Sequence, residues 1–403
     1  MATRVATAER FSLERVDFDK VIGVAAILSG LFAFFVALPP ITARTIVWPV
    51  VAGAVAVSLG GWVVARGRRR LGWGGVASGI VGTALGILAT RSSVGHLEEV
   101  VVWSALLAAM LRYATPLTFA AIGGMFSERS GVVNIGLEGM MLMGAFFGIW
   151  GADKTNSWVG GVLIAMAAGG LTALIHAFVS ITLRADQIVS GTAINFLALG
   201  VTGYFFVEIY GDEGTPPEDK LPAIPDVNLH LGSNFFGEWF GDQNLMIWLS
   251  ILAVVLSWVV MFKTPVGLRI RSVGEHPRAA DTVGISVYLV RYAAVIVSGI
   301  LAAMGGAYLS IGFNHSFSEN MTAGRGFIAL AALIFGRWRP FGALAGCLLF
   351  GFASALSDRL PTYSQSAAIL FNILPYAITL IAVAGVIGRS IPPAAIGRPY
   401  RKQ

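Results

Sequence analysis

The 403-residue chain has a single cysteine, few charged residues and none of the common motifs for phosphate or zinc binding. Because Cys347 stands alone, the chain has neither an intrachain disulfide nor a cysteine-ligated metal cluster. No G-x-x-x-x-G-K-[ST] loop for ATP phosphates and no H-E-x-x-H zinc pair occurs. We therefore expect no catalytic residues, no metal site and no cofactor in this chain.

Long apolar runs make up much of the sequence. Hydrophobic residues make up 56% of the chain and charged residues 12%, and the mean hydropathy is +0.75. Uncharged runs at 21–38, 46–65, 71–90 and 245–262 are each long enough to cross a hydrocarbon core of about 30 Å. The composition predicts an all-α polytopic membrane protein with about ten to twelve transmembrane helices, some of them broken or re-entrant.

The net charge of +6 does not indicate nucleic-acid binding, because the cations cluster in loops beside apolar spans. Lys and Arg accumulate on cytoplasmic loops. The basic amino terminus, the Arg66–Arg70 loop and the tail at 389–403 are therefore expected inside the cell, with both termini cytoplasmic. The segment 208–244 has Lys220 as its only Lys or Arg and is expected outside, with a surface helix at 235–240.

A polar, basic island, GLRIRSVGEHPRAADTVGISV at 267–287, separates two apolar segments. Pro277 suits the first position of a helix and Gly284 the position just past a helix end. The short helix between them offers a small apolar face from Ala279, Ala280 and Val283. This pattern is typical of a docking helix on a cytoplasmic loop at 264–291, although an ordinary solvated connector has the same composition.

A second polar interruption lies at 128–139, within an otherwise apolar stretch. Glu128 and Arg129 precede SGVVNIGLEG, in which Asn134 and Glu138 occur among three glycines. Polar groups at membrane depth face a bundle interior or a wet cavity, and broken helices are tolerated only there. A broken helix is expected, with Asn134 and Glu138 either lining a passage or hydrogen-bonding between helices.

Polar side chains also begin the following segment of the core. Gln187 and Asn195 stand at helical spacing near the start of a span and leave the same two alternatives open. His176, inside the preceding span, has no acidic partner at helical spacing and is expected to be a packing residue.

These stretches together resemble the permease subunits of ABC importers of the nucleoside and simple-sugar group, the branched-chain amino acid, ribose and nucleoside permease family. The resemblance is carried by LRIRSVGEHPRAADTVGIS, SGVVNIGLEG, Gly336-Arg-Trp-Arg-Pro340 and the carboxyl-terminal Pro393–Tyr400. It begins near residue 103 and omits the first three spans. It implies an amino-terminal extension at 1–99, a permease core of two related halves at 100–388 and a basic tail at 389–403.

In that family the loop helix docks on a cytoplasmic ABC ATPase, which holds ATP and Mg²⁺ and drives alternating access. The resemblance assigns this coupling role to Gly274, Glu275, His276, Pro277, Arg278, Ala279, Ala280, Asp281 and Gly284. It also implies a second permease, homologous or identical, an extracytoplasmic substrate-binding lipoprotein, a plasma-membrane location and a nucleoside or related sugar-containing solute.

An ion-gradient-driven transporter of a small polar solute is the alternative. Such a protein would be expected to pair acidic groups within its spans, whereas Glu138 stands alone. The permease sequence does not identify the solute, because selectivity in this family lies mainly in the binding protein.

Overall fold

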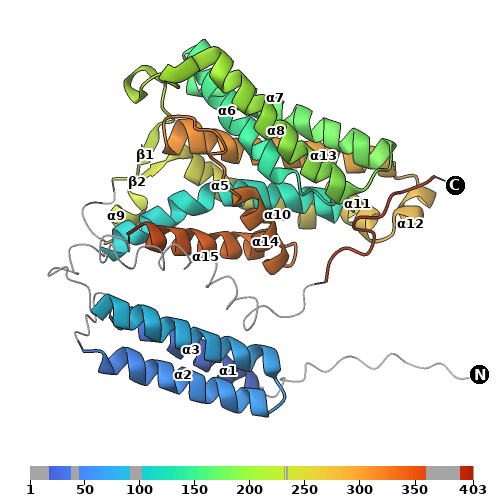
Figure 1. The fold of residues 1–403 in the computed structure, drawn as a ribbon. Coiled ribbons are helices and arrows are strands. Elements are labelled where there is room, and N and C mark those ends of the chain that lie inside the picture. The colour runs from blue at the N-terminus through green and yellow to red at the C-terminus, as the bar shows by residue number, and fades with distance from the viewer. Residues whose placement is uncertain are drawn as a thin grey trace, which may run out of the picture. The chain divides into compact units, whose positions relative to one another are not determined.

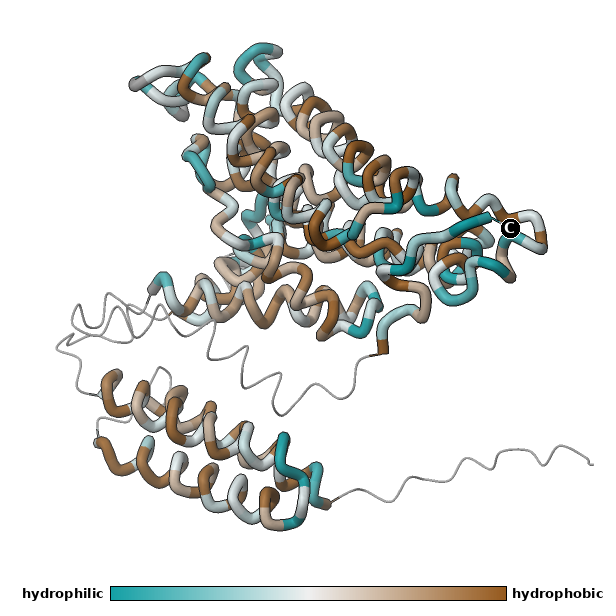
Figure 2. Tube along the Cα trace, turned by 45° about the vertical axis from the view of Figure 1, so that its right-hand side comes forward, coloured by the Kyte–Doolittle hydropathy of each residue, from teal (hydrophilic) through white to brown (hydrophobic). Residues whose placement is uncertain are grey.

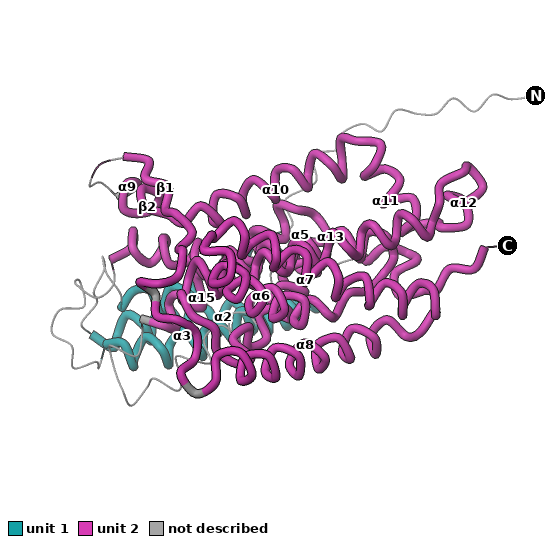
Figure 3. Tube along the Cα trace, turned by 90° about the horizontal axis from the view of Figure 1, so that it is seen from above, with its two compact units in different colours: residues 1–101, 360–388 teal, residues 102–359, 389–403 magenta. Residues whose placement is uncertain are grey.

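The structure is a computed structural model that describes residues 18–37, 45–90, 102–230, 232, 235–359 and 391–402. Contacts divide the chain into two compact units (Figure 3). Unit 1 comprises residues 1–101 with 360–388, and unit 2 comprises 102–359 with 389–403. The domain boundaries drawn from the sequence stay predictions.

Unit 1 contains three apolar helices that pack against one another (Figure 1). They are α1 (Phe18–Phe35), α2 (Val47–Ala65) and α3 (Arg69–Thr90). Glycines on α3 bring the backbones together: a Cβ on Gly82 would lie 1.8 Å from the carbonyl oxygen of Gly30. Small residues permit this close approach between membrane helices. Three of the four uncharged runs in the sequence are thus confirmed as helices.

Unit 2 is built around α5 (Trp103–Arg129) and α13 (Val287–Ala307), which contact each other along their lengths. Helices α6 and α7 pack on α13, while α10, α14 and α15 pack on α5. The remaining long elements are α6 (Leu137–Thr155), α7 (Trp158–Ala177), α8 (Gln187–Tyr210), α10 (Leu245–Lys263), α14 (Arg325–Phe335) and α15 (Pro340–Arg359). One π-helical turn extends α7 at Phe178–Thr182 and another extends α13 at Tyr308–Phe313.

Nine helical stretches in the part of the chain that the structure describes are long and apolar enough to cross a membrane. Hydrophobic residues follow the helices, and hydrophilic residues gather where the helices end (Figure 2). The prediction of an all-α polytopic membrane protein is confirmed. The end of the expected permease core, residues 360–388, lies outside the described residues. The strand content of the described part is one pair of short strands.

The two ends of unit 2 carry different elements (Figures 1 and 3). At the α9 end lie the helix α9 (Phe235–Phe240) and the antiparallel strands β1 (Asp226–Asn228) and β2 (Asp242–Asn244), with 3₁₀ turns at Gly211–Glu213 and Glu218–Lys220. The surface helix predicted at 235–240 is confirmed. At the α12 end lie α11 (Pro265–Glu275), α12 (Pro277–Thr282) and the tail segment 391–402.

Candidate functional site

The α11–α12 pair forms because local signals begin and end each helix. The Thr264 hydroxyl accepts a hydrogen bond from the Gly267 N–H (3.3 Å) and caps α11. His276 leaves helical geometry, Pro277 starts α12, and Gly284 has a φ of +83° just after it. The predicted short helix after Pro277 is confirmed. Helix α11 was not predicted, although the Thr-Pro pair before it is a recognisable helix start.

The coupling residues proposed from the sequence divide into exposed and buried positions. Most face outward, and Val283 beside them is 74% exposed. Gly274 and Ala280 are buried, and Ala280 packs with Val273, Val287 and Tyr400. The expectation that Ala280 belongs to an outward apolar docking face is therefore wrong, because the side chain packs into the protein's own interior.

Gly274 of α11 packs directly against the carboxyl end of α5. A Cβ at Gly274 would lie 2.0 Å from the carbonyl oxygen of Arg129, so the two backbones touch. The Gly274 carbonyl accepts a hydrogen bond from the Ala395 N–H (2.9 Å). Only glycine fits at this crossing, which links the α12 end to the helix break that follows α5.

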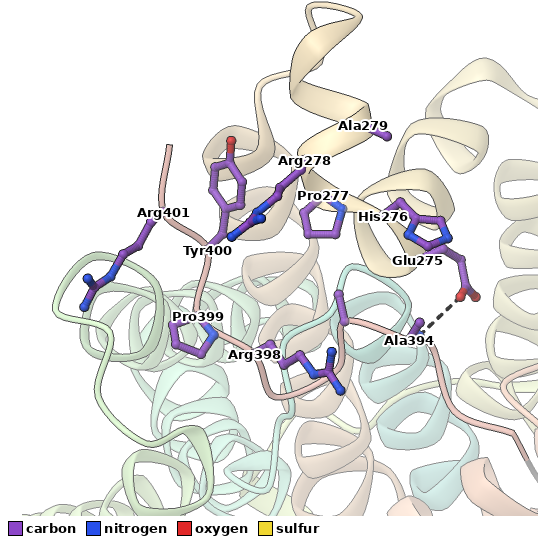
Figure 4. A pocket seen from close by; sticks show the side chains of 11 residues that line it. Glu275, His276, Pro277, Arg278, Ala279, Ala394, Arg398, Pro399, Tyr400 and Arg401 are labelled. Carbon is purple, nitrogen blue, oxygen red and sulfur yellow. Dashed lines mark hydrogen bonds between the residues drawn. The ribbon is translucent and has the colours of Figure 1, made fainter. Parts of the chain in front are cut away.

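The tail segment 391–402 lies beside the end of α11 and α12 (Figure 4), and it is hydrogen-bonded to the start of α13. The Gly397 N–H donates to the Gly131 carbonyl (3.2 Å), and the Ala394 N–H donates to Oε2 of Glu275 (3.2 Å). The sequence predicted a basic tail, and it did not predict these contacts.

Two side chains at the start of α13 hold the far part of the tail. Arg291 Nη1 donates to the Arg398 carbonyl (3.0 Å), and the Tyr288 hydroxyl donates to the Tyr400 carbonyl (3.3 Å). Arg291 is 1% exposed. Burial and a hydrogen bond with the Asp281 carboxylate raise the pKa of the Tyr400 hydroxyl above its usual value. The tail is thus an ordered part of the α12 end.

The chain is not helical between Arg129 and Leu137, as the sequence predicted. Backbone groups in such a break need partners from elsewhere, because lipid supplies none. The Val133 N–H donates to Oε1 of Gln187 (2.7 Å), and the Val133 carbonyl lies 3.1 Å from Nε2 of His176. His176 also contacts the Ser190 hydroxyl (3.0 Å), which confirms it as a packing residue.

Asn195, about two turns further along α8 than Gln187, bonds to the same break. Its Oδ1 accepts from the Gly139 N–H (2.8 Å), and its Nδ2 donates to the Ile135 carbonyl (3.1 Å). Asn134 donates through Nδ2 to the Ser298 hydroxyl (2.9 Å) of α13. These side chains are buried and bonded within unit 2. Their role in lining a passage stays a prediction.

Glu138 connects the start of α6 with the start of α14. Its two carboxylate oxygens accept hydrogen bonds from the N–H groups of Gly324 (2.8 Å) and Gly326 (2.6 Å). A carboxylate at a helix amino terminus satisfies unpaired amides and complements the helix dipole. The break before α6 and the start of α14 therefore meet at one carboxylate.

The carboxyl end of α5 is also hydrogen-bonded to the turn between α14 and α15. The sequence did not predict this contact. Trp338 Nε1 donates to the Glu128 carboxylate, and Arg129 Nη2 donates to the Trp338 carbonyl (2.9 Å). Arg337 and Trp338 have φ values of +55° and +53° in this turn. The signal in the sequence was the charged pair that ends the apolar run of α5.

Comparison with known proteins identifies relatives over most of unit 2. The family described as "Branched-chain amino acid transport system / permease component" matches residues 106–383. The guanosine ABC transporter permease protein NupQ of Bacillus subtilis is 46% identical over 325 residues, which cover 76% of this chain and 99% of that relative.

Two further relatives cover similar lengths. The nucleoside ABC transporter permease protein NupC of Lactococcus lactis is 40% identical, over 74% of this chain and 96% of that relative. The putative glucose ABC transporter permease protein TsgC13 of Haloferax volcanii is 37% identical, over 66% of this chain and 80% of that relative. No solved structure matches. Because the family match covers more than half of the chain, the protein belongs to the branched-chain amino acid transport system permease family and is a membrane-spanning permease component of an ABC transporter.

Proposed function

We propose that the chain forms the passage of an ATP-driven importer for nucleosides or related sugar-containing solutes in the plasma membrane. Two relatives at 46% and 40% identity carry guanosine and nucleoside in their names, whereas the glucose relative is 37% identical. This order favours nucleosides over simple sugars as the solute.

The distribution of basic residues supports an orientation with the α12 end in the cytoplasm. That end carries Arg129, Arg184, Arg278, Arg337 and Arg398. Three crossings by unit 1 would take the chain from a cytoplasmic amino terminus to the outside before α5. Ser104 near the start of α5 contacts Glu238 of α9, so α5 begins at the α9 end. This contact supports an orientation with both termini inside and the α9 end outside.

Energy arrives, on this proposal, from a separate cytoplasmic ATPase that holds ATP and Mg²⁺, with no cofactor in this chain. The exposed residues of α12 and the adjoining loop form the docking surface, including Glu275, His276, Arg278 and Ala279. Pro277, Asp281 and Gly284 shape the helix, while Gly274 and Ala280 anchor it to unit 2.

One observation carries the coupling mechanism: the docking elements touch the broken helix directly. Gly274 meets the α5 backbone at Arg129, and the break that follows continues to Glu138, whose carboxylate holds α14. Packed elements of this kind move as connected bodies. A displacement of α12 would therefore shift the break and α14 together and change the side to which the passage opens.

The four polar residues expected near the passage support this picture by their bonds. Asn134, Gln187 and Asn195 hold the break in shape, and Glu138 joins it to α14. We propose that this segment forms part of the passage wall. A second permease, homologous or identical, would complete the passage, and a substrate-binding lipoprotein would dock at the α9 end.

The test is purification of the chain from its native membrane in mild detergent, followed by reconstitution into proteoliposomes. We expect an ATPase and a second permease to be retained, and guanosine uptake to require ATP. A chain that purifies alone and transports guanosine on an ion gradient would refute the importer and support the gradient-driven alternative.

A further inference from the structure

A groove separates α12 from the tail (Figure 4). Its volume is about 570 Å³, and both elements contribute walls. From α11–α12 come Glu275 to Ala279, and from the tail come Ala394, Ala395 and Arg398 to Arg401. The family match ends at residue 383, so the second wall lies beyond the matched residues.

The charge of this groove is predominantly positive. Arg278 lines it from α12, and Arg398 and Arg401 line it from the tail. Glu275 is its only acidic lining residue, and Oε2 of that carboxylate already accepts a hydrogen bond from the Ala394 N–H. Asp281 nearby is engaged by the Tyr400 hydroxyl. The lining therefore carries three guanidinium groups against one carboxylate, and its net charge is positive.

The tail wall is fixed to the elements that carry the coupling contacts. It bonds through its backbone to Gly274 and Gly131, and Arg291 holds the Arg398 carbonyl. Because these bonds use backbone atoms of the tail, they leave the arginine side chains available to the groove. A force on this wall would reach the α5–α6 break through the same two glycines.

We propose that the groove is half of the ATPase docking surface and receives an acidic segment of the ATPase, with Arg398 and Arg401 of the tail as direct contacts. This inference rests on the proposed function and adds a second element to the docking helix. Guanidinium groups bind carboxylates with paired, directional hydrogen bonds.

The surroundings of the groove favour a protein over a free anion or a lipid headgroup. Ala279 lines the groove and is exposed, and Val283 on the following turn is 74% exposed. Apolar contacts beside charged ones are typical of protein interfaces. A phosphate would leave these apolar side chains uncovered.

The decisive comparison uses two adjacent tail residues. Arg401 lines the groove, whereas Lys402 is exposed and does not line it. Full-length chains with Arg398→Glu, Arg401→Glu or Lys402→Glu would be purified in detergent, and their affinity for the ATPase recovered with the unaltered chain would be measured across a range of NaCl concentrations.

We expect Arg398→Glu and Arg401→Glu each to weaken ATPase binding about tenfold at low salt, since like charges across an interface repel. The loss should shrink at high salt, and Lys402→Glu should bind nearly as the unaltered chain does. Equal melting temperatures of all four chains would show that the losses are not due to unfolding.

Two results would overturn the inference: unchanged ATPase binding by both groove variants, or an equal loss in Lys402→Glu. Reduced binding of the groove variants to vesicles with anionic lipid, together with normal ATPase binding, would also overturn it and assign the groove to headgroups. The proposed function fails separately, if the unaltered chain retains no ATPase.

Discussion

The substitution Glu138→Gln tests whether one carboxylate joins α6 to α14. Both carboxylate oxygens accept backbone hydrogen bonds, from Gly324 at 2.8 Å and Gly326 at 2.6 Å. A glutamine amide offers one oxygen, and its NH₂ group would face the other backbone N–H. The variant therefore loses one of the two hydrogen bonds and sets its NH₂ group against a backbone N–H, so that two donors face each other. The hydrogen bond that remains has a neutral oxygen as its acceptor in place of a charged one.

The expected loss of stability follows from the environment of the Gly324 and Gly326 N–H groups. Hydrogen bonds between membrane helices average about 0.6 kcal/mol, because alternative partners are available. The amides at the start of α14 have no helical partner, and Gly326 is buried. We therefore expect the free energy of unfolding to fall by about 1–3 kcal/mol, the range for unpaired buried groups and for bonds to charged acceptors.

Thermal unfolding of the purified chain in detergent measures this loss, and reconstituted uptake measures its effect on transport. Glu275→Gln is the matched control, because Glu275 is exposed and bonds one amide, at 3.2 Å. Its expected effect on stability is below about 0.5 kcal/mol. A Glu138→Gln chain as stable as this control, with normal uptake, would refute the assigned role of the carboxylate.

Three further substitutions test other contacts by the same stability measurement. Gly274→Ala should lower the free energy of unfolding by about 1–3 kcal/mol, because the new methyl group would overlap the α5 backbone. It should also reduce ATP-dependent uptake, and normal uptake would argue against coupling through the contact between Gly274 and α5. Gln187→Leu should leave the Val133 N–H without its acceptor and lower the free energy of unfolding by about 1–3 kcal/mol. An unchanged melting temperature would show that the break does not depend on Gln187. Gly82→Ala should destabilise the bundle of unit 1 by a similar amount, since its Cβ would lie 1.8 Å from the Gly30 oxygen; cysteine cross-linking between α1 and α3 that stays unchanged would contradict this packing.

The positions of the helices were predictable because hydropathy is a local property. The runs at 46–65 and 245–262 correspond closely to α2 (Val47–Ala65) and α10 (Leu245–Lys263). The break before Glu138 was predictable too, since glycines and polar groups interrupt an apolar run there. Pro277 and Gly284 bounded α12 for a similar local reason, through their restricted and permissive backbone geometry.

The partners of the polar residues were not predictable in the same way. Asn134, Gln187 and Asn195 were recognised as polar groups in apolar spans, and the sequence left passage lining and helix bonding open. The structure gives their bonds, of which the one from Val133 to Gln187 spans 54 residues. Such pairings depend on how helices pack, and no local pattern encodes them.

The sequence by itself determined that this is a polytopic helical membrane protein with a short helix in a basic loop and a broken helix, because composition, hydropathy and helix-end signals are properties of neighbouring residues. Only the tertiary structure decided that Ala280 faces inward, that the tail forms a wall beside α12, and that Glu138 bonds glycines more than 180 residues away. These features arise where segments distant in the sequence come into contact, since a buried backbone group takes whichever partner the packing brings within reach.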